Sequence, residues 1–106
     1  MTFTALNLTP AVLNALPSRL SSPTRIQTQA IPAALAGNDL LAMAQTGSGK
    51  TLAFGLPLLQ RVEKDNGGIQ GVVLVPTREL AAQVSMALQE IASPMGINIV
   101  MLCGGV

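Results

Sequence analysis

The sequence predicts an α/β fold, in which a parallel sheet is flanked by helices. Three short apolar runs alternate along the chain with segments of helical periodicity, and two of these runs are rich in β-branched residues. The first run ends in a glycine-rich segment that leads directly into a helical segment. The order strand, helix, strand, helix, strand indicates a parallel sheet, because parallel strands are usually connected through helices.

The first third of the chain predicts two helices. Thr9-Pro10 is a typical helix start, with threonine as the cap and proline in the first turn, and Pro17 ends this helix. Ser22-Pro23 repeats the same start signal and opens the second helix. We expect Pro32 to interrupt that helix and Gly37 to close the region.

The middle of the chain predicts a unit of strand, helix and strand. Asn38-Asp39 is a turn signal, and the run at residues 40–44 has the length and position of a buried strand. Residues 50–64 predict a helix, in which Pro57 is expected to cause a kink. A glycine-containing loop then leads into a β-branched strand at residues 72–75.

The last third predicts one more helix and one more strand. Apolar residues recur there at helical spacing, at Leu80, Val84, Leu88 and Ile91. Ser93-Pro94 ends this helix, and residues 97–103 predict the third strand, which Gly104-Gly105 follows. Doubly wound domains usually have more strands, so we expect residues 1–106 to be one truncated domain.

The composition excludes several classes of protein. Hydrophobic residues make up 49% of the 106 residues and charged residues only 10%, whereas disordered chains are rich in charge. No run reaches the ~18–20 apolar residues that a membrane-spanning helix needs. The first ten residues lack the basic residues of a secretory signal. We therefore expect a cytoplasmic protein without membrane contact.

The charge and the residue types also limit the chemistry. The net charge of +1 gives no general attraction to nucleic acid. Histidine is absent, which excludes a histidine base and an ordinary zinc site. The single cysteine, Cys103, cannot form an internal disulfide, and its apolar surroundings are typical of a small buried side chain in a reducing compartment.

Residues 44–51, with the sequence AQTGSGKT, are the strongest motif in the chain. They lie between a predicted strand and a predicted helix, the context in which a phosphate-binding loop is specific. The glycines let successive N–H groups turn toward phosphate oxygens, and the helix adds its positive end. Lys50 can neutralise the outer phosphates and Thr51 can bind magnesium. The predicted nucleotide contacts are Gln45, Thr46, Gly47, Ser48, Gly49, Lys50 and Thr51.

An acidic residue that would hold magnesium for hydrolysis is missing from its expected place after a second strand. The run at residues 72–75 leads into residues 76–79, with the sequence PTRE, and the last run leads into Gly104-Gly105. Glu79 lies four residues beyond its strand, where a capping or ion-pairing role is favoured. The sequence therefore predicts a chain that holds a nucleotide but does not hydrolyse it well alone. A structural glycine-rich turn is the weaker alternative.

Four segments together resemble the first half of the amino-terminal motor domain of DEAD-box ATP-dependent RNA helicases, with bacterial members most similar. Residues 23–27 (PTRIQ) resemble the Q motif, and residues 44–51 match motif I, AxTGxGKT. Residues 76–80 (PTREL) match motif Ia, and residues 104–105 match a glycine doublet. The resemblance, which runs from Phe3 to the last residue, implies a P-loop NTPase with a truncated, RecA-like parallel sheet.

The resemblance also implies roles for individual residues. Gln27 would read the adenine edge with its amide, and Thr24 and Arg25 lie in the same motif. Phe3 stands where the family has an isolated aromatic near the base. Leu20 would pack against adenine. The residues implied to lie along the RNA backbone are Pro76, Thr77, Arg78, Gly104 and Gly105.

The chain departs from the family pattern in two ways. Arg19-Leu20 stands where the family usually has glycine and an aromatic, so ring stacking is lost and weaker nucleotide affinity is expected. The DEAD tetrapeptide, the SAT motif and the second motor domain lie outside these 106 residues, so the resemblance implies that this part alone is inactive. In the full-length helicase, binding of ATP or ADP with Mg²⁺ and ATP hydrolysis would drive RNA duplex unwinding or RNP remodelling.

Two other classes of function remain as alternatives. The chain could be a non-catalytic interaction module, because a missing strand beside the phosphate-loop strand would expose apolar sheet edges. Such edges predict a homo-oligomer. A small-molecule P-loop kinase is the third reading, and Gln27 and the PTREL segment argue against it, since such kinases need neither.

Overall fold

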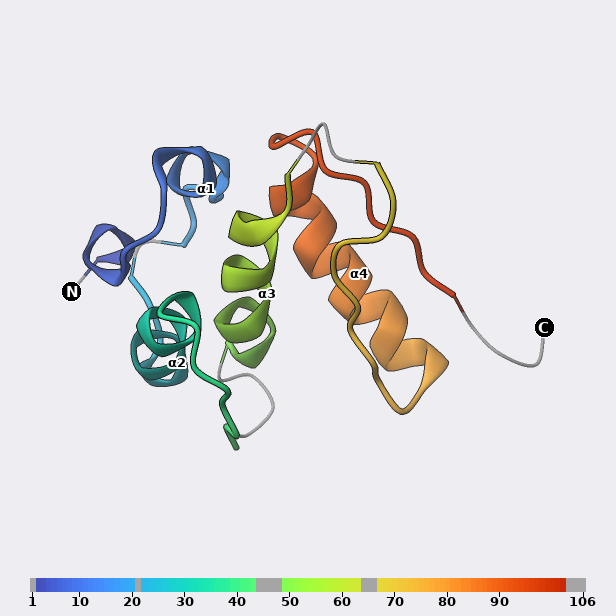
Figure 1. Cartoon of the computed structure of the whole chain (residues 1–106), viewed down its shortest axis with the longest axis horizontal. Coiled ribbons are helices and arrows are strands. Elements are labelled where there is room, and N and C mark those ends of the chain that lie inside the picture. The colour runs from blue at the N-terminus through green and yellow to red at the C-terminus, as the bar shows by residue number, and fades with distance from the viewer. Residues whose placement is uncertain (1, 21, 44–48, 64–66, 103–106) are drawn as a thin grey trace.

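The computed structural model describes residues 2–20, 22–43, 49–63 and 67–102. In these residues a 3-10 helix is followed by four α-helices: η1 (Phe3–Leu6), α1 (Pro10–Ala15), α2 (Arg25–Leu35), α3 (Lys50–Arg61) and α4 (Arg78–Ala92). Helix α3 packs against both α2 and α4 and lies between them (Figure 1), while η1 packs against α2, and α1 packs against α3 and α4. None of the described helices is long and apolar enough to span a membrane.

The predicted sheet is not confirmed. The described parts of the predicted strands, which we call the three apolar segments (residues 40–43, 72–75 and 97–102), form neither helix nor strand. Most of their large side chains are exposed: Leu41 is 94% exposed, Leu74 90% and Leu102 86%. Apolar composition predicts that a segment can be buried, but a strand also needs a neighbour at hydrogen-bonding distance. No backbone hydrogen bond joins these segments to one another within the described ranges.

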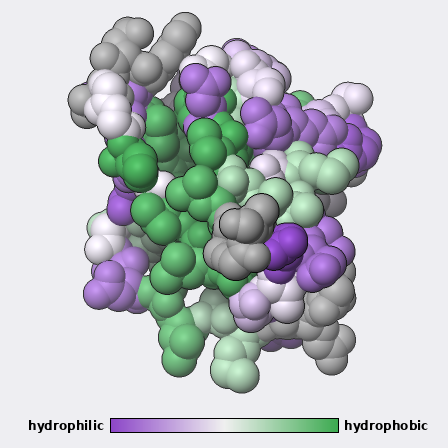
Figure 2. All heavy atoms as spheres, turned by 90° about the vertical axis from the view of Figure 1, so that its right-hand side faces the viewer, coloured by the Kyte–Doolittle hydropathy of each residue, from purple (hydrophilic) through white to green (hydrophobic). Residues whose placement is uncertain are grey.

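The exposed apolar side chains are concentrated rather than scattered. Figure 2 shows an apolar band on the side of the molecule that carries α4 and two of the three apolar segments. The large exposed residues of these two segments are Val72, Val73, Leu74, Val100, Met101 and Leu102. These exposed residues are therefore ones that the sequence predicts in buried strands.

The predicted helices are confirmed, with some shifts at their ends. Helix α1 begins at Pro10 as predicted, whereas α2 begins at Arg25 because Thr24, not Ser22, is its N-cap. Pro32 does not interrupt α2, which continues to Leu35. A proline removes one backbone bond, and the remaining bonds and the packing of α2 carry the helix past it. Helix α3 ends at Arg61, three residues earlier than predicted.

One hydrophobic core joins the amino-terminal segment to the helices. Its largest fully buried side chains are Leu6, Val12, Ile31, Leu56 and Ile91. The predicted apolar stripe of α4 is buried at all of its positions except Leu80, the one nearest the start of that helix. Burying one side chain of this size stabilises a fold by about 1.5–3 kcal/mol, so these contacts account for much of the helix packing.

Polar side chains of α3 fix the segments around it. The Gln60 amide accepts a hydrogen bond from Thr9 N at 2.8 Å and donates one to Asn7 O at 3.5 Å. Arg61 Nη2 donates to Ala34 O at 2.6 Å, in the last turn of α2, where a cation is also favoured by the helix dipole. These contacts connect α3 to η1, α1 and α2 by bonds that no sequence pattern indicated.

Gly55 sets the distance between α3 and α4. A Cβ atom at this position would overlap Leu88 Cδ2, and Leu88 is buried. We expect Gly55→Val to destabilise the chain by about 1–3 kcal/mol, the typical result of overpacking, because any gain in helix propensity is smaller. The matched control is Gly67→Val, since nothing lies within 4 Å of a Cβ at Gly67. Urea unfolding followed by circular dichroism measures both, and equal midpoints would contradict the close approach.

Candidate functional site

The start of α2 is built by a reciprocal pair of hydrogen bonds between Thr24 and Gln27. Gln27 N donates to Thr24 Oγ1 at 3.4 Å, and Thr24 N donates to Gln27 Oε1 at 2.9 Å. This arrangement is a capping box, which satisfies backbone N–H groups that a helix start leaves without partners. The local sequence therefore fixes both the start of α2 and the orientation of the Gln27 amide.

The same amide reaches across to the start of α3. Gln27 is 3% exposed, and its Nε2 donates to Gly49 O at 3.1 Å. A primary amide has two acceptor lone pairs and two N–H donors. The contacts among the described residues use one of each, which leaves one lone pair on Oε1 and one N–H on Nε2 without a partner in the described part of the chain. The structure thus brings two segments of the predicted site, 22 residues apart, into direct contact.

Gly49 is the residue that permits this contact. Its φ of 83° lies in the left-handed region, where glycine is favoured. A Cβ atom at Gly49 would overlap Gln27 Nε2 and would lie 2.9 Å from Thr24 Oγ1. Both the backbone conformation and the space around it therefore require glycine here, and this is independent of any bound phosphate.

Lys50 and Thr51 form the first turn of α3, next to Gly49. Lys50 is exposed and Thr51 is half-buried. Both line a hollow of about 530 Å³ between α3 and the segment that leads into α4, together with Pro76 and Leu80. The structure therefore places Lys50, the lysine of the predicted phosphate loop, and the PTREL segment around the same hollow. Gln45, Thr46, Gly47 and Ser48 lie outside the described residues.

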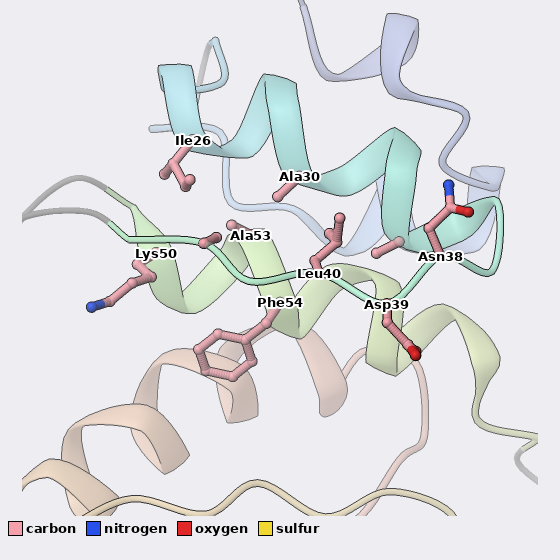
Figure 3. Close-up of a pocket in the computed structure, with 10 residues that line it drawn as sticks. Ile26, Ala30, Asn38, Asp39, Leu40, Lys50, Ala53 and Phe54 are labelled. Atoms are coloured by element: carbon pink, nitrogen blue, oxygen red, sulfur yellow. The ribbon is translucent and has the colours of Figure 1, made fainter.

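A second hollow, of about 640 Å³, lies between α2, α3 and the first apolar segment. Lys50 lies at one end of it and Asn38 and Asp39 at the other, and Leu40 points toward α2 (Figure 3). Its walls are mainly apolar, with Ile26, Ala30, Ala53 and Phe54 among the lining residues. Such an apolar lining does not suit a phosphate group. Among the described residues, Lys50 is the one predicted site residue that lines this hollow.

The PTREL segment forms the start of α4. Thr77 caps this helix, because its Oγ1 accepts a hydrogen bond from Leu80 N at 3.0 Å. Arg78 is exposed on the first turn, and Glu79 follows it as an acidic residue in that turn, where the helix dipole favours it. Gly104 and Gly105 lie outside the described residues.

The remaining predicted site residues are not gathered around Gln27 in the same way. Phe3 is 5% exposed and belongs to the hydrophobic core, so little of its ring is available to a ligand. Leu20 is half-buried and packs against the same core. Arg25 is exposed as the first residue of α2.

Sequence reasoning missed two features of this region. The bond from Gln27 to Gly49 has no sequence signal beyond the presence of the two motifs, and Arg19 pairs with Glu90, 71 residues away. No group of three or more histidine, cysteine, aspartate or glutamate residues gathers among the described residues.

Comparison with known families gives a direct match. Residues 24–106 match the family described as DEAD/DEAH box helicase. The ATP-dependent rRNA helicase RRP3 of Scheffersomyces stipitis is 46% identical over 105 residues, which are 98% of this chain and 22% of the relative. The DEAD-box ATP-dependent RNA helicase CshA of Bacillus cereus is 44% identical over 105 residues, 98% of this chain and 20% of the relative. The chain thus spans about a fifth of these relatives.

Comparison with solved structures also finds a DEAD box protein and an RNA helicase. A DEAD box protein from Methanococcus jannaschii superimposes with a TM-score of 0.83 at 38% identity, covering 100% of this chain and 30% of that one. The RNA helicase Prp28 from Chaetomium thermophilum, bound to ADP, gives a TM-score of 0.85 at 38% identity, covering 99% and 27%. Saccharomyces cerevisiae Dbp5, bound to RNA and ADP BeF3, gives 0.84 at 34% identity, covering 90% and 25%. The expected homo-oligomer receives no support from these comparisons.

The requirement for glycine at Gly49 can be tested against a second glycine of similar conformation. Gly37 has a φ of 91°, but nothing lies within 4 Å of a Cβ there. Gly37→Ala should therefore lower the free energy of unfolding by about 1–2 kcal/mol, the cost of placing a non-glycine residue at a positive φ. Gly49→Ala should carry the same backbone cost and should also displace the Gln27 amide. Urea unfolding and hydrogen exchange of the Gln27 side-chain N–H groups measure the two effects. Equal behaviour of both variants would contradict the Gln27–Gly49 contact.

Proposed function

The chain belongs to the DEAD/DEAH box helicase family, and from this premise we propose that it is the nucleotide-binding part of a helicase motor domain. Residues 1–106 form the amino-terminal portion of the first RecA-like domain in this proposal. They bind an adenine nucleotide. The longer protein uses ATP binding and hydrolysis to unwind RNA duplexes or remodel RNA–protein complexes, and this part alone is not expected to hydrolyse ATP.

The Gln27 amide is the observation that carries the proposal. Adenine presents an N6 donor beside an N7 acceptor on one edge, and a glutamine amide can bond both at once. The remaining lone pair and N–H of Gln27 match this pair. Guanine presents O6 and N7, both acceptors, so its O6 would face the Oε1 lone pair. The inner bonds to Thr24 N and Gly49 O hold the amide in one orientation, which favours adenine over guanine.

The phosphates lie at the start of α3 in this proposal. The backbone N–H groups of the loop and the positive end of α3 bind phosphate oxygens, and Lys50 neutralises the outer phosphates. The Thr51 hydroxyl suits a magnesium ion held between nucleotide and protein. Because Gln27 bonds to Gly49, the group that reads the base and the helix that binds the phosphates are held by one contact.

The base is covered by apolar side chains rather than by a ring. Leu20 packs against adenine, and Phe3 supports the core behind it, since the Phe3 ring is itself almost fully buried. Stacking of a base on an aromatic ring is worth about 1–3 kcal/mol in other nucleic-acid sites. We therefore expect weaker nucleotide affinity than in a helicase with an aromatic at this position.

RNA follows the start of α4. Pro76, Thr77 and Arg78 contact its sugar-phosphate backbone, with Gly104 and Gly105 allowing close approach. Support comes from the hollow that Lys50 and Thr51 share with Pro76, which sets the nucleotide side and the RNA side next to each other. Contacts to phosphates carry no sequence information, so the RNA is bound without base specificity.

Calorimetric titration of the chain with ADP and with GDP, in the presence of magnesium, tests the proposal. We expect ADP to bind at least about tenfold more tightly than GDP, a difference of about 1.4 kcal/mol. Lys50→Ala should weaken ADP binding by a similar factor, because it removes the cation at the phosphates. Equal binding of ADP and GDP would overturn the adenine assignment.

A substitution at Gln27 separates base reading from phosphate binding. Gln27→Glu removes the N–H donors that face Gly49 O and adenine N7, so it should abolish the preference for ADP over GDP. The matched control is Gln29→Glu, which makes the same change at an exposed residue of the same helix. Circular dichroism confirms that each variant is folded. If Gln27→Glu keeps the ADP preference, the amide does not read the base.

A further inference from the structure

Arg19 and Glu90 form an ion pair between two distant parts of the chain. Arg19 Nη1 donates to Glu90 Oε2 and Arg19 Nη2 donates to Glu90 Oε1, each at 2.5 Å. The two parallel bonds form the bidentate geometry that fixes orientation as well as distance. The hydrogen bond to Glu90 raises the pKa of Arg19, and the hydrogen bond to Arg19 lowers the pKa of Glu90. The pair is therefore fully charged at neutral pH.

Arg19 lies in the connection between α1 and α2. Leu20 N donates to Pro17 O at 3.0 Å and closes a turn there, and the Leu20 side chain packs against the hydrophobic core. The same connection ends at Thr24, which caps α2 and bonds Gln27. A turn at residues 17–20 and the capping box at Thr24 therefore shape the connection, and the ion pair of Arg19 joins it to α4.

Glu90 lies near the end of α4, a helix of 15 residues that begins at Arg78. It is not part of any motif discussed above. Helix α4 is anchored in the core through Val84, Leu88 and Ile91, so it provides a fixed support for whatever Glu90 holds. The ion pair connects this support to the segment that carries Leu20 and Thr24.

We propose that Arg19 is a positioning residue for adenine binding: through Glu90 it holds the connection between α1 and α2 against α4, with Leu20 in place to cover the base. This inference rests on the proposed adenine nucleotide site. A leucine side chain interacts less favourably with the base than an aromatic ring does. Its contribution therefore depends more on the side chain being held in the binding position beforehand. Arg19 stands next to that leucine.

The pair is exposed, with 63% of the Arg19 side chain and 42% of the Glu90 side chain accessible to solvent. Exposed pairs make small contributions and are screened by salt. We therefore expect Arg19→Ala and Glu90→Ala each to weaken ADP binding only about twofold to fivefold. The double variant should be no weaker than either single one, because both remove the same contact.

Two further variants distinguish the charge pair from packing by the Arg19 stem. The charge-swapped Arg19→Glu, Glu90→Arg double variant should restore ADP binding. The difference between wild type and Arg19→Ala should shrink as salt is raised from about 0.05 M to about 0.5 M. Glu63→Ala is the control, since it removes an exposed acid that lies two residues beyond α3 and takes no part in this pair, and it should leave ADP binding unchanged.

Hydrogen exchange of the Leu20 and Thr24 amides tests the positioning itself without nucleotide. Both amides should exchange faster in Arg19→Ala and in Glu90→Ala, while the Leu88 amide in α4 should not change. If wild type prefers ADP to GDP and Arg19→Ala binds ADP equally well, the inference is wrong and the proposed function stands. If wild type shows no preference, the proposed function fails, and unchanged exchange at Leu20 and Thr24 would then also refute the positioning role.

Discussion

The buried Gln27 amide is the contact on which the candidate site depends. It forms half of the box that starts α2, and it bonds the carbonyl of Gly49, where α3 starts. Each bond restricts the other, since the box orients the amide and the amide fixes the approach of the two helices. A side chain on Gly49 would break this arrangement. The glycine of the motif is therefore required by protein packing, whether or not a phosphate is bound.

Local features of the fold could be predicted from the sequence, because their causes are local. Pro10 marks the start of α1, and the apolar spacing from Leu80 to Ile91 marks the buried face of α4. Contacts between distant residues could not be predicted. Nothing in a single sequence indicates that Gln60 bonds Asn7, or that Arg19 bonds Glu90, since each of these pairs is more than 50 residues apart.

The sheet was predicted for a sound reason and is still not formed by the described residues. Apolar runs are hydrophobic whether or not a partner is present, so their composition cannot reveal which strand lies beside them. Leu41, Leu74 and Leu102 have the residue type of a sheet interior and the exposure of a surface. The close match to solved helicase domains nevertheless extends over the whole chain. The overall similarity to these domains therefore does not depend on a hydrogen-bonded ladder among the described parts of the three apolar segments.

The helices and the three apolar segments contribute differently to the architecture. The positions of α2, α3 and α4 are held by their own core and by side-chain bonds at their ends, such as Arg61 to Ala34. The groups proposed to read the base and to bind phosphate lie at the starts of α2 and α3, and those proposed for RNA lie at the start of α4. All three starts are fixed by capping or by helix-to-helix contacts among described residues. The helical layer therefore positions the described members of these groups, and the second apolar segment lines the hollow beside Lys50 and Thr51.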